Sequence, residues 1–338
     1  MQDTQTLDQV LAALPPRWSP RLAQSRAAQG AARPPSILIT GCSSGIGLDA
    51  ALRVSGLGWK VFATCRGEPP SVLAACGVQV IQLELESPAS IIAAATTLRA
   101  LLDCPLDAAF LNAGYAVAGA VEDLPLGAWH TQFQVNLFGQ VDLASRLIRS
   151  RLLSRGSRLV WCGSVLGIVP MPMRGAYAAS KAAMEAVADT QRLELAHKGI
   201  AVSVIQPGPI LTRFRANSLA ALLRWVDLES TDYLPAYAAT VARLRKVGAS
   251  SAGTLGPDAV TEALLRCLDA DRPAARYRVT RNTSVMEAMR RALPRRWLEA
   301  IVRRAAGREL LPPVAAAGMN AEGEHRFAMA PGRVESRS

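Results

Sequence analysis

Short apolar runs alternate with longer Ala- and Leu-rich stretches from residue 36 onward, and this alternation limits the fold more than any other feature. The short runs contain β-branched residues and are largely apolar on both faces, which is typical of parallel strands covered by helices above and below. The longer stretches have room for the crossover helix that joins two parallel strands. We therefore predict an α/β fold with a doubly wound, seven-stranded parallel sheet flanked by helices. The predicted strands are residues 37–40, 60–64, 79–83, 108–111, 158–162, 201–205 and 277–280.

The segments on either side of this rhythm are predicted to be additions to one domain at 36–282. Residues 1–35 contain five prolines and are expected to form a partly disordered extension. Within the domain, residues 209–250 are rich in Leu, Ala and Arg and are predicted to form an inserted helical lid. Residues 283–307 are predicted to be basic helices divided by Pro294, and residues 308–338 a disordered tail.

The net charge of +11 is concentrated near the C-terminus rather than spread over the chain. Residues 272–308 contain eleven Arg and two Glu, so this segment alone carries 11 − 2 = +9. The excess indicates a local basic surface, and no nucleic-acid partner is predicted.

The less common residue types argue against several kinds of site. The six cysteines are scattered without a CxxC pair, as expected for reduced thiols of a cytosolic protein. The three histidines have no metal-ligand spacing, so no metal site is predicted. No apolar run approaches the ~20 residues that span a bilayer. Because the N-terminus lacks the features of a secretory signal, we expect a cytoplasmic protein.

The stretch TGCSSGIG, residues 40–47, lies between the first predicted strand and the helix that follows it. In a doubly wound sheet this turn lies at the edge where ligands bind. Its glycines let the backbone approach a pyrophosphate, and the next helix offers unpaired N–H groups at its N-terminus. The spacing is GxxxGxG rather than GxGxxG, and on its own the turn also suits a tight connection that binds nothing.

Three further stretches favour the binding interpretation: LNAG at 111–114, GSV at 163–165 and YAASK at 177–181. Tyr177 and Lys181 are four residues apart and share one face of a helix. A lysine ammonium beside a phenol lowers the pKa of the phenol from about 10, which makes Tyr177 usable as a general acid or base near neutral pH. The Ser164 hydroxyl, after the fifth strand, could hold a substrate oxygen beside it.

This combination resembles the short-chain dehydrogenase/reductase family over about residues 36–280. TGCSSGIG, VFATCR and GSV are most similar to its hydroxysteroid and retinol dehydrogenase branch. The resemblance implies a single Rossmann domain that moves a hydride between a nicotinamide nucleotide and a substrate carbon. The matching stretches are TGCSSGIG, LNAG, QVNLFG with Asn136, GSVLG with Ser164, YAASK and QPGPILT at 206–212.

Catalytic roles for four residues follow from the resemblance. Tyr177 is similar to the general acid/base of the family, and Lys181 to its partner, which also binds the nicotinamide ribose. Ser164 matches the residue that orients the substrate oxygen. Asn136 resembles the asparagine that supports a water-mediated proton relay through the lysine.

The resemblance also implies a set of cofactor-binding residues. Glu84, followed by Leu85, stands where the family usually has an Asp that meets the adenine amine, and the longer acid could serve with a small shift. The other implied residues are Gly41, Ser43, Ser44, Gly45, Ile46 and Gly47 for the pyrophosphate, Asn112, Ala113 and Gly114 beside the adenosine, and Pro207, Gly208, Ile210 and Thr212 for the nicotinamide carboxamide.

Arg66 decides which nucleotide we expect. NAD specificity in such folds usually needs an acid at the end of the second strand, where this chain has Cys65 followed by Arg66. A guanidinium is well shaped to bind a 2′-phosphate. We therefore predict NADP(H) over NAD(H), and carbonyl reduction as the direction, because cellular NADP(H) pools are usually reducing.

Apolar residues on loops around the reacting carbon predict a pocket for a lipophilic alcohol or carbonyl compound, such as a steroid, a retinoid or a long-chain aldehyde. The alternative is that some of them are core or dimer contacts. The residues are Tyr115, Val117, Val165, Leu166, Val169, Met171 and Phe214.

Two rival functions fit the motifs less well. A cofactor-sensing or scaffold protein of the same fold would have no need of Asn136, Ser164, Tyr177 and Lys181 together. An epimerase or dehydratase of the extended branch tends to carry TGxxGxxG, which differs from the GxxxGxG spacing found here.

Two partner surfaces are also expected. The apolar stripe of residues 294–306 suits a helix docked on the core, which is the favoured interpretation, or an interfacial helix on an anionic membrane. The resemblance also allows a homodimer through the helices that carry Asn136 and Tyr177. The stripe consists of Trp297, Leu298, Ile301, Val302 and Ala305, with arginines on both sides.

Overall fold

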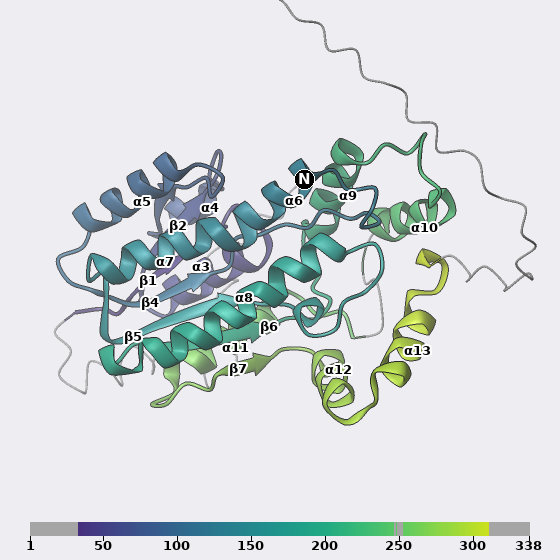
Figure 1. Ribbon diagram of the computed structural model, residues 1–338. Helices are drawn as coiled ribbons and strands as arrows, with labels where there is room; N and C mark the ends of the chain where they lie inside the picture. Colours follow the sequence, from purple (N-terminus) through teal and green to yellow (C-terminus); the bar gives the residue numbers. More distant parts are fainter. Residues whose placement is uncertain (1–32, 247, 249–252, 311–338) are drawn as a thin grey trace, which may run out of the picture.

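The computed structural model describes residues 33–246, 248 and 253–310, and a seven-stranded sheet runs through its centre (Figure 1). All neighbouring strands are parallel, in the order β3-β2-β1-β4-β5-β6-β7. The predicted α/β fold is therefore confirmed. The strands are β1 (Ser36–Ile39), β2 (Lys60–Cys65), β3 (Gln79–Gln82), β4 (Leu106–Leu111), β5 (Leu153–Cys162), β6 (Ala201–Gln206) and β7 (Arg276–Arg278).

Strand order fixes where a ligand can bind. The chain goes outward from β1 to β2 and β3, then returns to pair β4 with the other side of β1. The direction of winding therefore reverses between β1 and β4, and the crevice at this reversal is the usual ligand site of a doubly wound sheet. The TGCSSGIG turn follows β1 and the LNAG turn follows β4, so the topology brings the two turns together.

Strand boundaries differ from the prediction by one or two residues, except at the start of β5, where the difference is larger. β5 begins at Leu153 rather than at residue 158, because Leu153 pairs with Leu106 across a register shift in β4. The last strand ends at Arg278 rather than at residue 280. Thr280 instead caps the next helix, with its Oγ1 accepting from the Thr283 N–H at 3.2 Å.

Helices cover both faces of the sheet and close two apolar cores. On β1, Ile37 and Ile39 point into the core under α3 and α11, whereas Leu38 points into the core under α5, α7 and α8. This alternation explains why the strands are apolar on both faces. The sheet-covering helices are α3 (Gly45–Gly56), α4 (Ser71–Ala75), α5 (Pro88–Ala100), α7 (Gly139–Arg149), α8 (Gly175–Glu194) and α11 (Asp258–Asp269), and α6 (Leu126–Phe133) packs against α8.

The predicted lid region contains two helices, α9 (Phe214–Trp225) and α10 (Leu234–Arg245), between β6 and α11. They pack over a third apolar cluster, which includes Val117, Ala176 and Tyr237. Ala176 belongs to α8, so this cluster joins the lid to the helix that carries the YAASK motif.

The chain then forms two helices beyond β7. α12 (Arg281–Ala292) and α13 (Arg295–Ala306) are separated at Pro294, and the 3-10 turn η5 (Gly307–Glu309) follows them near α10 (Figure 1). The predicted disorder of residues 1–35 and 308–338 falls on segments that lie, apart from residues 33–35 and 308–310, outside the described residues.

Candidate active site

The turn after β1 presents backbone rather than side chains at the carboxyl edge of the sheet. Gly41 and Gly45 adopt left-handed backbone, with φ of 75° and 61°, which glycine does without strain. A Cβ on Gly47 would lie 2.2 Å from the Gly41 carbonyl oxygen, so only glycine fits there. The Ser44 side chain makes no capping hydrogen bond to any described residue, so it does not compete for the first N–H groups of α3. Such a helix N-terminus suits a phosphate group.

Thr40 joins the glycine turn to the turn after β4. Its buried Oγ1 accepts from the backbone N–H groups of Asn112 and Ala113, both at 2.9 Å. The Asn112 amide in return donates to the Thr40 carbonyl oxygen at 3.0 Å. Asn112 therefore holds the two strand ends together, and the two turns form one continuous edge.

Asn136 lies on a π-helical turn, η2 (Gln134–Phe138), between α6 and α7. Its Oδ1 accepts from the Tyr115 N–H at 3.1 Å, and its Nδ2 donates to the Tyr115 carbonyl at 3.0 Å and to Ser180 Oγ at 3.1 Å. A Cβ on Gly114 would lie 3.0 Å from Asn136 Oδ1 and 3.8 Å from Lys181 Nζ. The structure thus places Asn136 beside the LNAG turn and on the Lys181 side of it.

Ser164, Tyr177 and Lys181 meet where β5 ends against α8. Ser164 follows β5 directly, and its Oγ also caps the short η3 turn (Val165–Gly167) by accepting from the Leu166 N–H at 3.1 Å. The Ser164 side chain lies close enough to the Tyr177 phenol to lower its pKa. Lys181 Nζ donates to the Cys162 carbonyl at 2.7 Å and lies 6.0 Å from the centre of the Tyr177 ring.

Burial changes the expected proton chemistry of this group. Desolvation raises the pKa of the Tyr177 phenol above its ordinary value, although the Ser164 side chain works in the opposite direction. The prediction that Lys181 lowers the net pKa of Tyr177 is therefore wrong for the protein by itself. Tyr177 is 7% exposed and Lys181 5%, and burial also lowers the pKa of Lys181.

The segment after β6 closes the edge from the other side. The Pro207 carbonyl accepts from the Val165 N–H at 2.9 Å, which ties this segment to the Ser164 loop. Gly208 is packed so tightly that a Cβ there would meet Thr280 Oγ1 at 2.2 Å. At the far end, a Cβ on Gly45 would lie 3.0 Å from Thr212 Cβ. The Thr212 end of the QPGPILT segment therefore reaches the glycine turn, with Ile210 packed against the core between them.

The remaining predicted cofactor residues lie around the same edge. Ser43 is exposed, and Ile46 is half-buried on the first turn of α3. Arg66 is exposed directly after β2. After β3, Glu84 is exposed and Leu85 is buried, so only the former presents its side chain to solvent.

An elongated dinucleotide fits this edge. Bare backbone and a helix N-terminus face the place for phosphates, and Cβ-intolerant glycines occur at Gly47 and Gly208, on two sides of it. The Tyr115 hydroxyl is buried and has no hydrogen-bond partner among the described residues. A buried polar atom without a partner can mark a place where a bound ligand supplies the missing hydrogen bond.

On the substrate side, the Phe214 ring lies edge-on against Tyr177, with centroids 5.4 Å apart and planes at 66°. Tyr115, Val165, Leu166 and Met171 are half-buried on the loops around this pair. Two predicted pocket residues, Val117 and Val169, are instead buried. Val117 belongs to the cluster under the lid, and we correct its role to packing, because its side chain has no exposed surface to offer a substrate.

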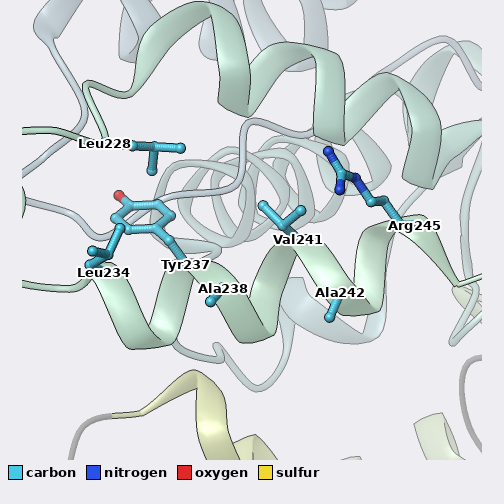
Figure 2. A pocket seen from close by; sticks show the side chains of 7 residues that line it. All are labelled: Leu228, Leu234, Tyr237, Ala238, Val241, Ala242 and Arg245. Carbon is cyan, nitrogen blue, oxygen red and sulfur yellow. The ribbon is translucent and has the colours of Figure 1, made fainter.

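The lid carries a separate pocket of about 350 Å³ on one side of α10 (Figure 2). None of its lining residues belongs to the predicted substrate pocket, so the two are distinct sets. The lining is Leu228, Leu234, Tyr237, Ala238, Val241, Ala242 and Arg245.

One ion cluster at the site was not predicted. Glu309, in η5, accepts from Arg174 Nη2 and from Arg243 Nε, each at 2.6 Å. Arg174 precedes α8 by one residue, and Arg243 lies on α10, so Glu309 fastens the chain between the Tyr177 helix and the lid. No local pattern could reveal this contact, because its members are 135 and 66 residues apart.

Glu185 was also not predicted, although its spacing in the sequence could have indicated it. It continues the i, i+4 spacing from Tyr177 through Lys181 along α8, and it is 9% exposed. A buried acid at that spacing faces the same side as the two predicted residues.

The structure also bears on metal binding and on membrane-spanning helices. Across residues 33–246, 248 and 253–310, no group of His, Cys, Asp and Glu side chains could hold a metal ion. In the same part of the chain, no helix is both long and apolar enough to cross a membrane.

Comparisons with known proteins agree with this geometry. Residues 35–222 match the short chain dehydrogenase family. The uncharacterized oxidoreductase YbbO of Escherichia coli is 38% identical over 79% of this chain and 93% of its own length. Human retinol dehydrogenase 8 is 30% identical over 73% of this chain and 81% of its own.

Solved structures share the fold at lower identity. A short-chain dehydrogenase from Sphingobium yanoikuyae in complex with NADPH has a TM-score of 0.58 and 22% identity, covering 80% of this chain and 97% of its own. An enzyme from Burkholderia phymatum in complex with NAD has a TM-score of 0.62 and 20% identity, covering 77% and 92%. Together, the match over more than half of the chain and the 38% identical relative show that this chain belongs to the short-chain dehydrogenase/reductase family, the NAD(P)-dependent oxidoreductases that act on CH–OH groups.

Proposed function

We propose that this protein is an NADP(H)-dependent reductase of lipophilic ketones or aldehydes, with Tyr177 as the general acid. The observation that carries the proposal is the buried contact of Ser164, Tyr177 and Lys181 between the glycine turn and an apolar lid. The nicotinamide supplies the hydride when it is bound. The turn residues would hold its phosphates, and Lys181 and Thr212 would lie on the nicotinamide side.

The protein residues then manage the proton. The raised pKa of Tyr177 keeps its phenol protonated, which is the form that a reduction consumes. In the proposed reaction, Tyr177 donates this proton to the substrate carbonyl oxygen while Ser164 holds that oxygen in place. The Lys181 ammonium stabilises the phenolate that remains, and Asn136 fixes the backbone beside Lys181.

The NADP(H) preference rests on Arg66. It is exposed immediately after β2, and its neighbours Cys65 and Gly67 carry no carboxylate; the first acid after this strand is Glu68. A charge-assisted hydrogen bond is worth about 1.5–3 kcal/mol, so Arg66→Asp should weaken NADPH binding by roughly 10- to 100-fold. Fluorescence titration with NADPH and NADH tests this, with Arg99→Asp on α5 as a matched exposed control. Unchanged NADPH affinity in Arg66→Asp would remove the proposed preference.

The lipophilic substrate rests on Phe214 and the half-buried apolar loops around Tyr177. The relative named retinol dehydrogenase 8 supports the same class. We expect kcat/KM to rise with apolar surface across steroids, retinaldehyde and medium-chain aldehydes. Turnover of small polar carbonyls alone would contradict the proposal. A nucleotide-binding scaffold without the reaction is the alternative, and it predicts NADPH binding with no turnover of any of these compounds.

For helix α13 we propose that its two ends do different things. Its C-terminal end docks on the protein, since Ala306 and Glu309 are buried. At its other end Trp297 is 58% exposed beside Arg295 and Arg296, which suits contact with an anionic membrane surface. We expect Trp297→Ala to reduce co-sedimentation with phosphatidylserine vesicles and Leu126→Ala, an exposed control on α6, to leave it unchanged. Equal binding by both variants would remove the membrane contact.

We further propose a homodimer through η2 and α8. Phe138 and Leu193 are large apolar side chains that remain 54% and 72% exposed on these two elements. Light scattering should give twice the chain mass for the wild type and a smaller mass for Phe138→Asp. A wild type that is monomeric at all concentrations would contradict the dimer.

A further inference from the structure

A buried carboxylate lies one helical turn beyond Lys181. Glu185 follows Lys181 by four residues on α8, so the two side chains share a face of the helix. We propose that Glu185 is a positioning residue that keeps the Lys181 side chain charged and in place, an inference that rests on the proposed roles of Tyr177 and Lys181.

The Glu185 carboxylate is fixed from two neighbouring strands. Its Oε1 accepts from Gln206 Nε2 of β6 at 2.9 Å, and its Oε2 forms an ion pair with Arg276 Nη2 of β7 at 3.0 Å. Oε2 has no hydrogen bond among the described residues, but turning the side chain away from Lys181 would break the hydrogen bond at Oε1 and the ion pair with Arg276. The position of the charge is therefore set by the sheet rather than by α8 alone.

Glu185 also contacts the loop that carries Ser164. A Cβ on Gly163 would lie 2.9 Å from Glu185 Oε1, so the carboxylate occupies the space beside this residue, and Gly163 must be glycine to leave it room. Ser164 is the next residue. One carboxylate thus lies against both the backbone before Ser164 and the helical turn that carries Lys181.

Glu185 is the carboxylate among the titratable neighbours of Lys181, and it acts across one helical turn rather than through a direct ion pair. Lys181 Nζ donates to the Cys162 carbonyl, and the neighbouring titratable side chains are Tyr177 and Glu185 on α8 and Cys162 on β5. Burial lowers the pKa of Lys181, whereas the Cys162 and Glu185 side chains raise it. Burial raises the pKa of Glu185 above its ordinary value, whereas Gln206 and Arg276 lower it and Asp189 raises it.

A purely structural role for Glu185 would be to tie α8 to the sheet. A variant of Asp189 distinguishes that role from the proposed one. Asp189 lies one turn further along α8 and binds Arg276 through both oxygens, at 2.9 and 2.7 Å. Asp189→Asn therefore weakens the same tie to Arg276 while leaving the carboxylate next to Lys181. Glu185→Gln removes that charge and retains an acceptor for Gln206.

The test follows the Lys181 ammonium directly. The chain contains four lysines, Lys60, Lys181, Lys198 and Lys246. The full protein labelled with ¹³C,¹⁵N-lysine therefore gives few side-chain NMR signals. The signal that disappears in Lys181→Arg is that of Lys181. We expect the titration of Lys181 to move to lower pH in Glu185→Gln, since an anion beside a cation raises its pKa. It should stay in place in Asp189→Asn. Thermal unfolding of each variant reports the structural tie separately.

The pH dependence of kcat/KM is a second, independent test. In Glu185→Gln the alkaline limb of kcat/KM should move to lower pH, with a loss of roughly tenfold on that limb and less than about twofold near neutral pH. Asp189→Asn should keep the wild-type profile. A structural role alone would scale the whole profile without moving it.

The outcomes distinguish this inference from the proposed function. Identical Lys181 titrations in wild type and Glu185→Gln would overturn the inference even if the enzyme is an active reductase. Full turnover by Tyr177→Phe would overturn the proposed function and leave the Lys181 titration to be judged on its own. If Glu185→Gln does not fold, Arg276→Gln supplies the opposite test. Loss of that guanidinium leaves Glu185 without its counter-ion, so Lys181 should titrate at higher pH, and no change would again overturn the inference.

Discussion

The nucleotide side and the substrate side of this site are held together by different forces. On the nucleotide side, hydrogen bonds between the Thr40 and Asn112 side chains and the neighbouring backbone join the two adjacent turns. On the proposed substrate side, between α8 and the lid, a carboxylate joins segments that are far apart in the chain, as Glu309 of η5 binds Arg174 and Arg243. The first arrangement depends on glycines at positions with no room for a Cβ, and the second on the charge of a few side chains. Steric changes should therefore damage the first side and charge changes the second.

The largest expected effect is steric and on the nucleotide side. Gly47→Ala places a Cβ 2.2 Å from the Gly41 carbonyl oxygen, so the turn has to open before α3 can pack. We expect NADPH affinity in a fluorescence titration to fall by more than about 100-fold, since overpacking against fixed backbone costs about 3 kcal/mol. Gly67→Ala is the control, because an added Cβ there meets nothing within 4 Å. Equal affinities in the two variants would mean that the turn is not the nucleotide site.

A smaller effect is expected from charge on the substrate side. Glu309→Gln leaves Arg174 and Arg243 without their shared partner in a buried setting, and breaking such a pair costs about 3 kcal/mol at most. Urea unfolding should show this loss. Substrate KM should also rise, because the lid is no longer fastened to α8, while NADPH affinity should stay within about twofold.

The control for this variant is Glu299→Gln on α13. Glu299 pairs with Arg295 at 3.1 Å, but both side chains are mostly exposed, so stability should hardly change. If the two variants were equally stable, or if Glu309→Gln weakened NADPH binding as much as it raised KM, the two sides would not be separable.

How far the sequence predicts these two sides also differs. The turns at 40–47 and 111–114 and the Tyr177–Lys181 pair are local patterns, because backbone geometry demands particular residues at fixed spacing. The Glu309 cluster depends on three segments meeting in space, which no spacing encodes. The pKa of Tyr177 likewise depends on the burial of its ring, which lies edge-on against Phe214, and this burial follows from packing of segments far apart in the chain.

The smallest expected effect concerns pH and the tie between α8 and β7. Hydrogen bonds from Arg276, together with Arg192, lower the pKa of Asp189 to about 2. Its contribution to stability is therefore present above its unfolded pKa of about 4 and is lost as the pH falls toward 2. Asp189 is 43% exposed, so Asp189→Asn should cost less than about 1 kcal/mol at pH 7. The difference from wild type in urea unfolding should shrink between pH 4 and pH 2, and a difference that grows there would contradict this account.

The central claim is that Tyr177 donates the proton to the substrate oxygen, and that NADPH binding does not depend on Tyr177. The most direct test measures Tyr177→Phe for NADPH binding by fluorescence and for reduction of a lipophilic ketone by the loss of NADPH absorbance. We predict NADPH affinity within about threefold of wild type and turnover lower by at least about 100-fold, since general acid catalysis supplies 10²–10⁴-fold. Tight NADPH binding with undiminished turnover in Tyr177→Phe would contradict the account.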